Sequence, residues 1–418
     1  MNYDSLILKK KDKTAQNPIV SVPYSKSISN RLLIIRHLSD SKAEIKNLSS
    51  SDDTIMLQNF IQSIANKTNN SFYCKNAGTT LRFLLALLSL TEGKWILDAD
   101  KRMQTRPLLP LIDALNNLGA DIKIKNSEEV FPITIIGKTL TGNKTIELKD
   151  NLTSQIISAL ILISPYIKGG VNLILPPNQV SLPYITMTVS LVNRFGGDIN
   201  QIDNTLVCRQ SEYKFKETSV EGDFSSAAFF YLYVAVGKIK NLRIKNLQTS
   251  YLQGDSICKD LFSQLGVETK FDGNGALLSY NEDLVSANQQ YEFDLKDFPD
   301  LFCPLVVACF VSGKATLIKN LASLRVKESD RLQNMINELN KINNRCKEGN
   351  DYLIIEPQLT DNYFELYKEE NVFFNTYNDH RIAMSLSAFS LVCNEITLEN
   401  PACVEKSFPD FWQQISKI

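Results

Sequence analysis

Apolar and polar positions form a pattern that recurs six times along the chain. In each occurrence, small polar residues open a helix that continues as an apolar run, and a second, amphipathic helix follows it. The openings of the six apolar helices are marked by Ser27, Thr79, Ser154, Ser225, Asp300 and Asp379. Because self-similarity at a steady period indicates repeated structural units, the pattern predicts six repeats of roughly 70 residues.

Glycines and β-branched segments complete each predicted unit. Three of the amphipathic helices end at Gly119, Gly196 and Gly266, where glycine is a usual helix stop. Short runs between the helices predict strands: ADIKIKN, FPITIIG, VNLILP, KIKNLRIKNL and ATLIKNL. The chain is therefore predicted to be an α/β protein. Its six repeats form either one solenoid or two halves of three, and a boundary near residue 220 would divide them equally.

Charge and composition narrow the class of protein. The 418 residues carry 45 Lys and Arg against 46 Asp and Glu, a formal net charge of −1. Such a balance argues against a nucleic-acid or anionic-membrane binder. The longest apolar stretches, including 156–167 and 302–311, are shorter than the ~18–20 residues of a membrane span. We therefore expect a cytoplasmic protein with no nucleic-acid or membrane partner.

Cysteine usage and cofactor motifs are also informative. The eight cysteines include no CxxC pair, and several lie in apolar runs such as LFCPLVVACF, so we expect reduced, buried thiols. The N-terminus has no apolar segment followed by a signal-peptide cleavage site. The sequence also lacks HExxH, Cys/His metal spacing, GxGxxG and the P-loop pattern. We therefore expect no cofactor and no metal.

The polar helix starts carry the first candidate binding residues. SKSISNR contains Lys26, Ser27 and Arg31, and NAGTTLR contains Asn76, Gly78, Thr79 and Arg82. Backbone N–H groups at a helix N-terminus, joined by hydroxyls and cations, bind phosphate and carboxylate. One such start is explained by helix capping alone, but several starts that also carry a cation favour anion binding.

Two arginines stand just before another predicted helix. Arg102 and Arg106 lie in DADKRMQTRPLL, and arginine suits bidentate recognition of carboxylate or phosphate better than lysine does. The alternative for each is a solvated surface side chain.

A dense cluster of charges lies in LRVKESDRLQNM. It is either a helix start laced by surface ion pairs or a site where Lys327 and Glu328 move protons, because mixed charge sets the pKa of a carboxylate. Asp300, at the mouth of an apolar helix, is either a cap or a base. His380 stands between Asp379 and Arg381 in TYNDHRIAM, whereas His37 has an ordinary helical context.

Together these motifs resemble the 5-enolpyruvylshikimate-3-phosphate (EPSP) synthase family, the 3-phosphoshikimate 1-carboxyvinyltransferases. The similarity runs nearly end to end, from SKSISNR through NAGTTLR, RMQTRP, TSQ, SLPY, EGDFSSA, LQGD, FPD, RVKESDRL and YNDHR to CVEKSFPDFW. It implies the two-domain enolpyruvyl transferase fold, an inside-out α/β barrel in each domain with three βαβαββ repeats, and an active site in the cleft between domains. The implied domains are 22–219 and 1–21 plus 220–418, in a monomer.

The resemblance also implies a reaction. The enolpyruvyl group of phosphoenolpyruvate passes to the 5-hydroxyl of shikimate 3-phosphate through a tetrahedral ketal, phosphate is released, and the product enters chorismate and aromatic amino acid biosynthesis. The two small-molecule substrates are the only implied partners. Both substrates carry a phosphate and a carboxylate, so each anionic group needs charge-assisted partners.

Motif by motif, the resemblance assigns residues to roles. Residues implied to hold shikimate 3-phosphate are Ser27, Arg31, Thr153, Ser154, Gln155, Ser181, Tyr184 and Lys327. Residues implied to hold phosphoenolpyruvate are Lys26, Asn76, Gly78, Arg106, Gln155, Arg331, Arg381 and Lys406. Thr79 and Asp300 complete the substrate-binding set together with Ser323, which stands where some members have Asn. The implied catalytic residues are Asp300, Glu328, Lys26, Lys327 and His380, with Asp300 as base and Glu328, supported by Lys327, as proton relay.

Some positions depart from the family pattern. Thr153 stands where Ser is usual and keeps the hydroxyl, while Phe83, Leu182 and Phe224 replace residues more common in the family. Gly78 is expected to leave room for phosphoenolpyruvate and for the competitor glyphosate. The alternatives are the related transferase that acts on UDP-N-acetylglucosamine and uses a loop cysteine as acid, and an inactive binding module on the same scaffold.

Overall fold

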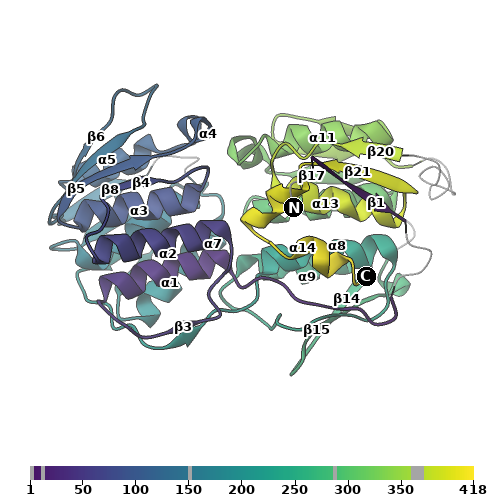
Figure 1. Ribbon diagram of the computed structural model, residues 1–418, viewed down its shortest axis with the longest axis horizontal. Helices are drawn as coiled ribbons and strands as arrows, with labels where there is room; N and C mark the ends of the chain where they lie inside the picture. The colour runs from purple at the N-terminus through teal and green to yellow at the C-terminus, as the bar shows by residue number, and fades with distance from the viewer. Residues whose placement is uncertain (1–3, 11–14, 149–152, 286–289, 359–370) are drawn as a thin grey trace. The chain divides into compact units, whose positions relative to one another are not determined.

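The computed structural model describes residues 4–10, 15–148, 153–285, 290–358 and 371–418 (Figure 1). The chain forms two compact units. The N-terminal unit is Ser25–Val220, and the C-terminal unit is Met1–Tyr24 with Glu221–Ile418. The chain therefore passes between units at residues 24–25 and 220–221. The family resemblance implied domains that begin at residues 22 and 220.

The N-terminal unit contains three sheets. The first has the order β4 (Ser71–Tyr73), β5 (Gly93–Asp98), β7 (Ile133–Gly137), β6 (Asp121–Lys123). The second has the order β8 (Lys144–Glu147), β9 (Val171–Ile174), β11 (Thr205–Arg209), β10 (Asp198–Ile202), and the third pairs β12 (Thr218–Ser219) with β3 (Ile45–Lys46). In both four-stranded sheets the first pair is parallel and the other two pairs are antiparallel.

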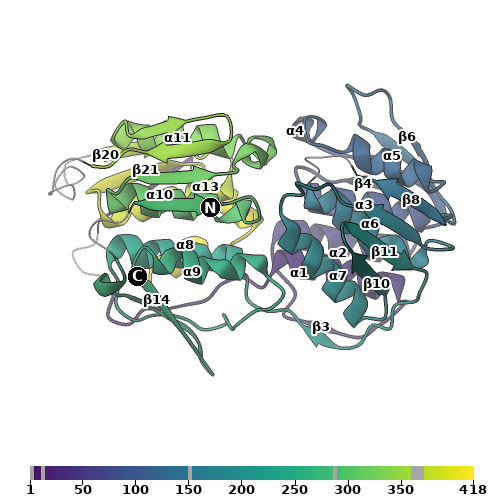
Figure 2. The same ribbon diagram turned by 180° about the vertical axis from the view of Figure 1, so that it is seen from behind.

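Two kinds of helix accompany these sheets. The interior helices are α1 (Lys26–Leu38), α3 (Gly78–Leu90) and α6 (Ser154–Ile163), and the outer helices are α2 (Asp52–Ala65), α5 (Leu109–Asn117) and α7 (Leu182–Arg194). Short helices α4 (Lys101–Gln104) and η1 (Ser164–Tyr166) connect them. A helix that is apolar on all sides must be enclosed, and nearly every residue of α6 is buried. Figure 2 shows the helices of the N-terminal unit grouped together, with β6, β8, β10 and β11 to one side of them.

The C-terminal unit repeats this plan. Its sheets have the orders β2 (Ile19–Val20), β13 (Leu242–Ile244), β15 (Gly275–Tyr280), β14 (Val267–Asp272); β16 (Tyr291–Asp294), β17 (Thr316–Lys319), β19 (Tyr352–Ile355), β18 (Cys346–Glu348); and β1 (Ser5–Lys9), β21 (Glu395–Glu399), β20 (Asn371–Phe374). The interior helices are α8 (Phe224–Gly237), α10 (Phe302–Ser312) and α13 (His380–Leu386), and the outer ones α9 (Cys258–Ser263), α11 (Arg331–Ile342) and α14 (Phe411–Ile415). Short 3₁₀ segments are η2 (Gly254–Ile257), η3 (Glu282–Leu284), η4 (Pro299–Leu301), η5 (Ala322–Val326), η6 (Ser387–Leu391) and η7 (Pro401–Lys406).

The six-repeat α/β prediction is confirmed, with exchanged strands at the ends of the chain. The second, third and fifth repeats run β-α-β-α-β-β in one stretch of sequence. The fourth receives its first strand from β2, which pairs parallel with β13, and the sixth is completed by β1, which pairs antiparallel with β21. The N-terminal segment therefore supplies strands that repeats four and six lack.

Local predictions about glycines, cysteines and apolar runs are confirmed. Gly119, Gly196 and Gly266 follow their helices with φ of 95°, 101° and 88°, a left-handed backbone that glycine adopts without steric cost. Seven of the eight cysteines are buried, and Cys403 is half-buried. The apolar runs are interior helices, and none of the helices in the described ranges is long and apolar enough to cross a bilayer.

Candidate active site

In the N-terminal unit, the three interior helices begin at the same end. The side chain of Thr153 caps α6 by accepting from the Gln155 N–H. Arg31, early in α1, donates through Nη2 to Ser158 Oγ of α6 at 3.0 Å. Arg82, early in α3, donates through Nη1 to Gln155 Oε1 at 2.8 Å. Because helix N-termini carry partial positive charge, this arrangement favours anionic ligands at the starts of α1, α3 and α6.

Arg31 joins several residues predicted to hold shikimate 3-phosphate. Its guanidinium donates to Ser27 O at 2.8 Å, to Tyr184 O at 3.2 Å and to Thr188 Oγ1 at 2.7 Å. Burial lowers the pKa of Arg31 to about 10, so the side chain stays a cation at neutral pH. Ser181, the residue before α7, is buried and has a left-handed backbone with φ of 58°.

Two guanidinium groups approach Gly78 closely. A Cβ built on Gly78 would lie 2.6 Å from Arg106 Nη2 and 2.7 Å from Arg82 Nη1. Arg82 is fully buried and also donates to the carbonyls of Gly78 and Pro107, at 3.1 and 2.5 Å. The structure therefore brings the predicted residues Gly78, Gln155 and Arg106 together around Arg82. Arg82 belongs to the motif NAGTTLR, but no role was predicted for it.

Lys26 has a partner that sequence reasoning missed. Its Nζ lies 3.0 Å from Oδ2 of Asp53, a buried carboxylate in the first turn of α2. The spacing along the sequence does not indicate this contact, because Asp53 follows Lys26 by 27 residues. Asn76 and Thr79 lie at the start of α3, and Ser154 begins α6.

In the C-terminal unit, three cations contact Asp300, which lies in η4 before α10. Arg331 Nη1 is 3.1 Å from Oδ1, and Arg381 Nη2 is 3.0 Å from Oδ2. Arg381 Nη1 also donates to the Asp300 carbonyl at 3.1 Å, and Lys327 Nζ lies 4.0 Å from Oδ1. The predicted base therefore contacts two arginines predicted to bind phosphoenolpyruvate.

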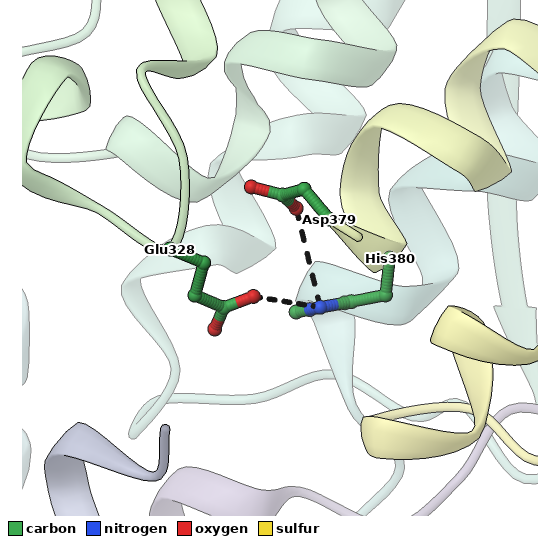
Figure 3. Close-up of side chains that lie close together, drawn as sticks. All are labelled: Glu328, Asp379 and His380. Carbon is green, nitrogen blue, oxygen red and sulfur yellow. Dashed lines mark ion pairs between the residues drawn. The ribbon is translucent and has the colours of Figure 1, made fainter. Parts of the chain in front are cut away.

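Glu328 occupies a second charged cluster (Figure 3). Lys406 Nζ lies 3.1 Å from Oε1, while His380 Nδ1 and Arg331 Nη2 lie 3.0 and 3.7 Å from Oε2. Burial by itself raises the pKa of the Glu328 carboxyl, but Lys406, His380 and Arg331 outweigh it and hold that pKa well below its usual range. Glu328 is therefore a carboxylate at neutral pH. Lys406 contacts Glu328, and Lys327 forms an ion pair with Asp300.

His380 is buried as the first residue of α13. Burial lowers the pKa of its imidazole below 6.5, and nearby Glu328 opposes this only in part. The ring is therefore neutral at pH 7. The ring nitrogen nearest Glu328 is Nδ1, which lies 3.0 Å from Oε2.

Asp379 links these clusters, although the sequence pattern predicted it only as a helix start beside His380. It is fully buried, and its carboxylate accepts from Arg331 Nε at 2.8 Å and from Arg331 Nη2 at 3.3 Å. It also accepts from the Arg381 N–H at 3.0 Å, which caps α13, and from Ser329 Oγ at 3.1 Å. An acidic residue directly before a helix was the only sequence signal for this function.

Glu328, Asp379 and His380 approach closely enough to hold a metal ion (Figure 3). The carboxylates already face cations, however, because Arg331 contacts both of them and Lys406 contacts Glu328. A divalent ion would be repelled by these cations at close range. The chemistry of the donor set therefore fits a charge-balanced acid cluster better than a metal centre.

Ser323 lies in η5, a few residues before Lys327, and is half-buried. Its contact with a substrate stays a prediction. The structure thus groups the predicted residues into one set at the interior helix starts of the N-terminal unit and one set around Asp300 and Glu328 in the C-terminal unit.

The chain resembles known enzymes along nearly its whole length. The chain is 33% identical to the 3-phosphoshikimate 1-carboxyvinyltransferase of Buchnera aphidicola, over 96% of each chain. It is 34% identical to that of Bacteroides fragilis, over 95% of this chain and 94% of the relative. The family model of EPSP synthase (3-phosphoshikimate 1-carboxyvinyltransferase) matches residues 10–415. The chain belongs to the EPSP synthase family of enzymes.

A solved structure supports the same fold. The EPSP synthase from Acinetobacter baumannii matches with a TM-score of 0.77 at 20% sequence identity, over 99% of this chain and 98% of that one. Family membership supports enolpyruvyl transfer in aromatic biosynthesis as the general activity.

Proposed function

We propose that the chain transfers the enolpyruvyl group of phosphoenolpyruvate to the 5-hydroxyl of shikimate 3-phosphate and releases inorganic phosphate. The observation that carries the proposal is the contact of Asp300, the candidate base, with Arg331 and Arg381. Arg331 and Arg381 are proposed to bind phosphoenolpyruvate, so Asp300, which they contact, would lie close to that substrate and could act as a base in its reaction. The family membership supports both substrates.

Binding of the acceptor is assigned mainly to the N-terminal unit. Arg31, beside Ser27 and Tyr184, supplies charge at the start of α1, and the start of α6 supplies hydroxyl and amide groups. Thr153, Ser154, Gln155 and Ser181, with Lys327 of the C-terminal unit, complete the proposed set. Charge-assisted hydrogen bonds of this kind compensate the lost hydration of a phosphate and a carboxylate.

Binding of phosphoenolpyruvate is assigned to both units. The proposed residues are Lys26, Asn76, Gly78, Arg106 and Gln155, with Arg331, Arg381 and Lys406. Gly78 contributes by having no side chain, since a Cβ there would meet the Arg106 guanidinium.

The proposed chemistry has two balanced steps. The 5-oxygen forms a bond to C2 of phosphoenolpyruvate while Asp300 takes the hydroxyl proton and the methylene carbon gains a proton, giving a tetrahedral ketal. The bond from C2 to the phosphate oxygen then breaks, phosphate leaves, and the methyl group returns a proton to restore the double bond. Glu328 is the proposed relay at carbon, and Lys26 and Lys327 stabilise the negative charges of the reacting groups.

Glu328 needs a higher pKa to donate a proton at neutral pH. In the free protein Lys406 and Arg331 hold that pKa low, and both are proposed ligands of phosphoenolpyruvate. An anionic substrate that pairs with these cations competes with Glu328 for them. The effect of burial, which raises the pKa of the Glu328 carboxyl, is then opposed less strongly. Substrate binding would therefore raise the pKa of Glu328 and prepare it as an acid.

The related transferase that acts on UDP-N-acetylglucosamine is disfavoured by the cysteines. Cys74, close before α3, is buried, and burial raises the pKa of its thiol to about 12. A thiol acid or nucleophile needs exposure and a lowered pKa.

The test is phosphate release from phosphoenolpyruvate by the purified chain. We expect release that depends on shikimate 3-phosphate, with the vinyl ether product visible by proton NMR. UDP-N-acetylglucosamine in place of shikimate 3-phosphate should give none. Release with UDP-N-acetylglucosamine alone, or no release with either acceptor, would overturn the proposal and favour the related transferase or a binding module, respectively.

A further inference from the structure

The loop before α13 contains a turn with an unfavourable backbone. The Asp379 N–H donates to Thr376 O at 2.9 Å and closes the turn, and the two central residues, Tyr377 and Asn378, have φ of 55° and 54°. Asparagine tolerates this left-handed region, but an aromatic residue rarely occupies it, because its Cβ crowds the following carbonyl. Contacts from outside the turn must therefore hold Tyr377 in place.

Glu338 of α11 supplies those contacts. Its carboxylate is fully buried, and Oε1 accepts from Tyr377 Oη at 2.7 Å. Oε2 accepts from the Asn375 N–H at 2.9 Å and pairs with Lys341 Nζ at 2.5 Å. Three donors, one of them a cation, compensate the burial of this charge.

The same helix holds the other end of the loop. Arg331 precedes Glu338 by seven residues, so both side chains lie on one face of α11, two turns apart. Arg331 binds Asp379 through Nε at 2.8 Å. We call this pair of contacts, Glu338 with Asn375 and Tyr377 and Arg331 with Asp379, the α11 clamp.

We propose that Glu338 and Tyr377 are positioning residues of the active site. They fix the strained turn that presents Asp379, His380 and Arg381, and they act on substrate only through those residues. The role of Arg381 and Arg331 toward phosphoenolpyruvate rests on the proposed function. The clamp itself rests on contacts within the C-terminal unit.

Tyr377→Phe tests the proposal because it removes only the hydroxyl. We expect the KM for phosphoenolpyruvate to rise about tenfold, the equivalent of one lost hydrogen bond to a charged group, with the KM for shikimate 3-phosphate changed by less than about twofold. Amide hydrogen exchange in the free protein should become faster across 375–381. The matched control is Tyr213→Phe, since Tyr213 Oη also donates from a buried site, to Leu162 O at 2.7 Å in the N-terminal unit. This control should leave both KM values and the exchange of 375–381 unchanged.

Glu338→Gln is the second variant and keeps the shape and one acceptor oxygen. It should give the same selective effect, smaller than that of Glu338→Ala. Unchanged exchange across 375–381 together with a wild-type KM for phosphoenolpyruvate in Tyr377→Phe would overturn the proposal. So would equal rises in both KM values with faster exchange throughout the C-terminal unit, the result expected of a merely structural residue. If wild-type protein releases no phosphate, the proposed function fails, and hydrogen exchange still decides whether the clamp exists.

Discussion

Lys406 Nζ lies 3.1 Å from Glu328 Oε1, so a cation assigned to phosphoenolpyruvate neutralises the carboxylate assigned to proton transfer. This contact couples binding to acid strength. Any ligand that draws Lys406 away from Glu328 raises the pKa of Glu328, because the carboxyl is buried and loses a compensating charge.

Replacement of Lys406 by Met tests this coupling. Without this cation, burial raises the pKa of the Glu328 carboxyl. The part of the pH profile of kcat that reports Glu328 therefore moves to higher pH. We expect kcat at neutral pH to fall about a hundredfold, since a positioned charge near the reacting groups is lost. The pKa is measured by carbon NMR of labelled glutamate and compared with Lys417→Met, a change at an exposed lysine near the C-terminus. An unchanged Glu328 pKa would show that Lys406 does not control it.

Asp300→Asn and Glu328→Gln should each lower kcat by orders of magnitude, about 10²–10⁴-fold for a lost acid or base. The amides keep the size of the side chains, so the affinity for shikimate 3-phosphate, measured by calorimetry, should change little. Asp272→Asn serves as control because Asp272 is a surface carboxylate paired with Arg243. Near-normal turnover in either active-site variant would remove that residue from the mechanism.

The repeats and the polar helix starts were predictable from the sequence because both depend on local pattern. The interior helix α6 follows from an apolar run, and its start follows from the cap Thr153. The strands of the N-terminal segment were not predicted from pattern. β2 contains only Ile19 and Val20, and its register depends on β13, more than 200 residues away.

Partners of the charged residues were the least predictable part of the site. Lys327 and Glu328 are adjacent in sequence, yet Lys327 pairs with Asp300 and Glu328 pairs with Lys406. Asp379 binds Arg331 across 48 residues of sequence. Spacing along a helix predicts neighbours three or four residues apart, whereas these contacts depend on how helices from different repeats pack.

Gly78→Ala should displace Arg106, since the added methyl would lie 2.6 Å from Arg106 Nη2. We expect weaker inhibition by glyphosate and a higher KM for phosphoenolpyruvate, both by roughly tenfold or more, as expected when a charge-assisted contact is disturbed. Gly273→Ala is the control, because no atom lies within 4 Å of a Cβ at that exposed glycine. Inhibition constants for glyphosate against phosphoenolpyruvate decide the outcome, and equal inhibition of the Gly78→Ala and wild-type proteins would refute the expectation.

Asp255 is a buried carboxyl near Asp300, and its titration can be tested through the stability of the protein. It accepts a hydrogen bond from Ser225 Oγ, while burial and then the charge of Asp300 raise the pKa of its carboxyl to about 6. The folded protein therefore holds this proton more tightly than the unfolded chain, whose aspartates titrate near 3.9. The contribution of Asp255 to stability is fully present below about pH 4 and is lost as the pH rises through 6, by on the order of 2–3 kcal/mol. Asp255→Asn lacks the titration, so its free energy of unfolding relative to wild type should increase over that interval. Urea unfolding at several pH values from 4 to 7 measures the difference, and a difference that does not vary with pH would show that the Asp255 carboxyl titrates normally.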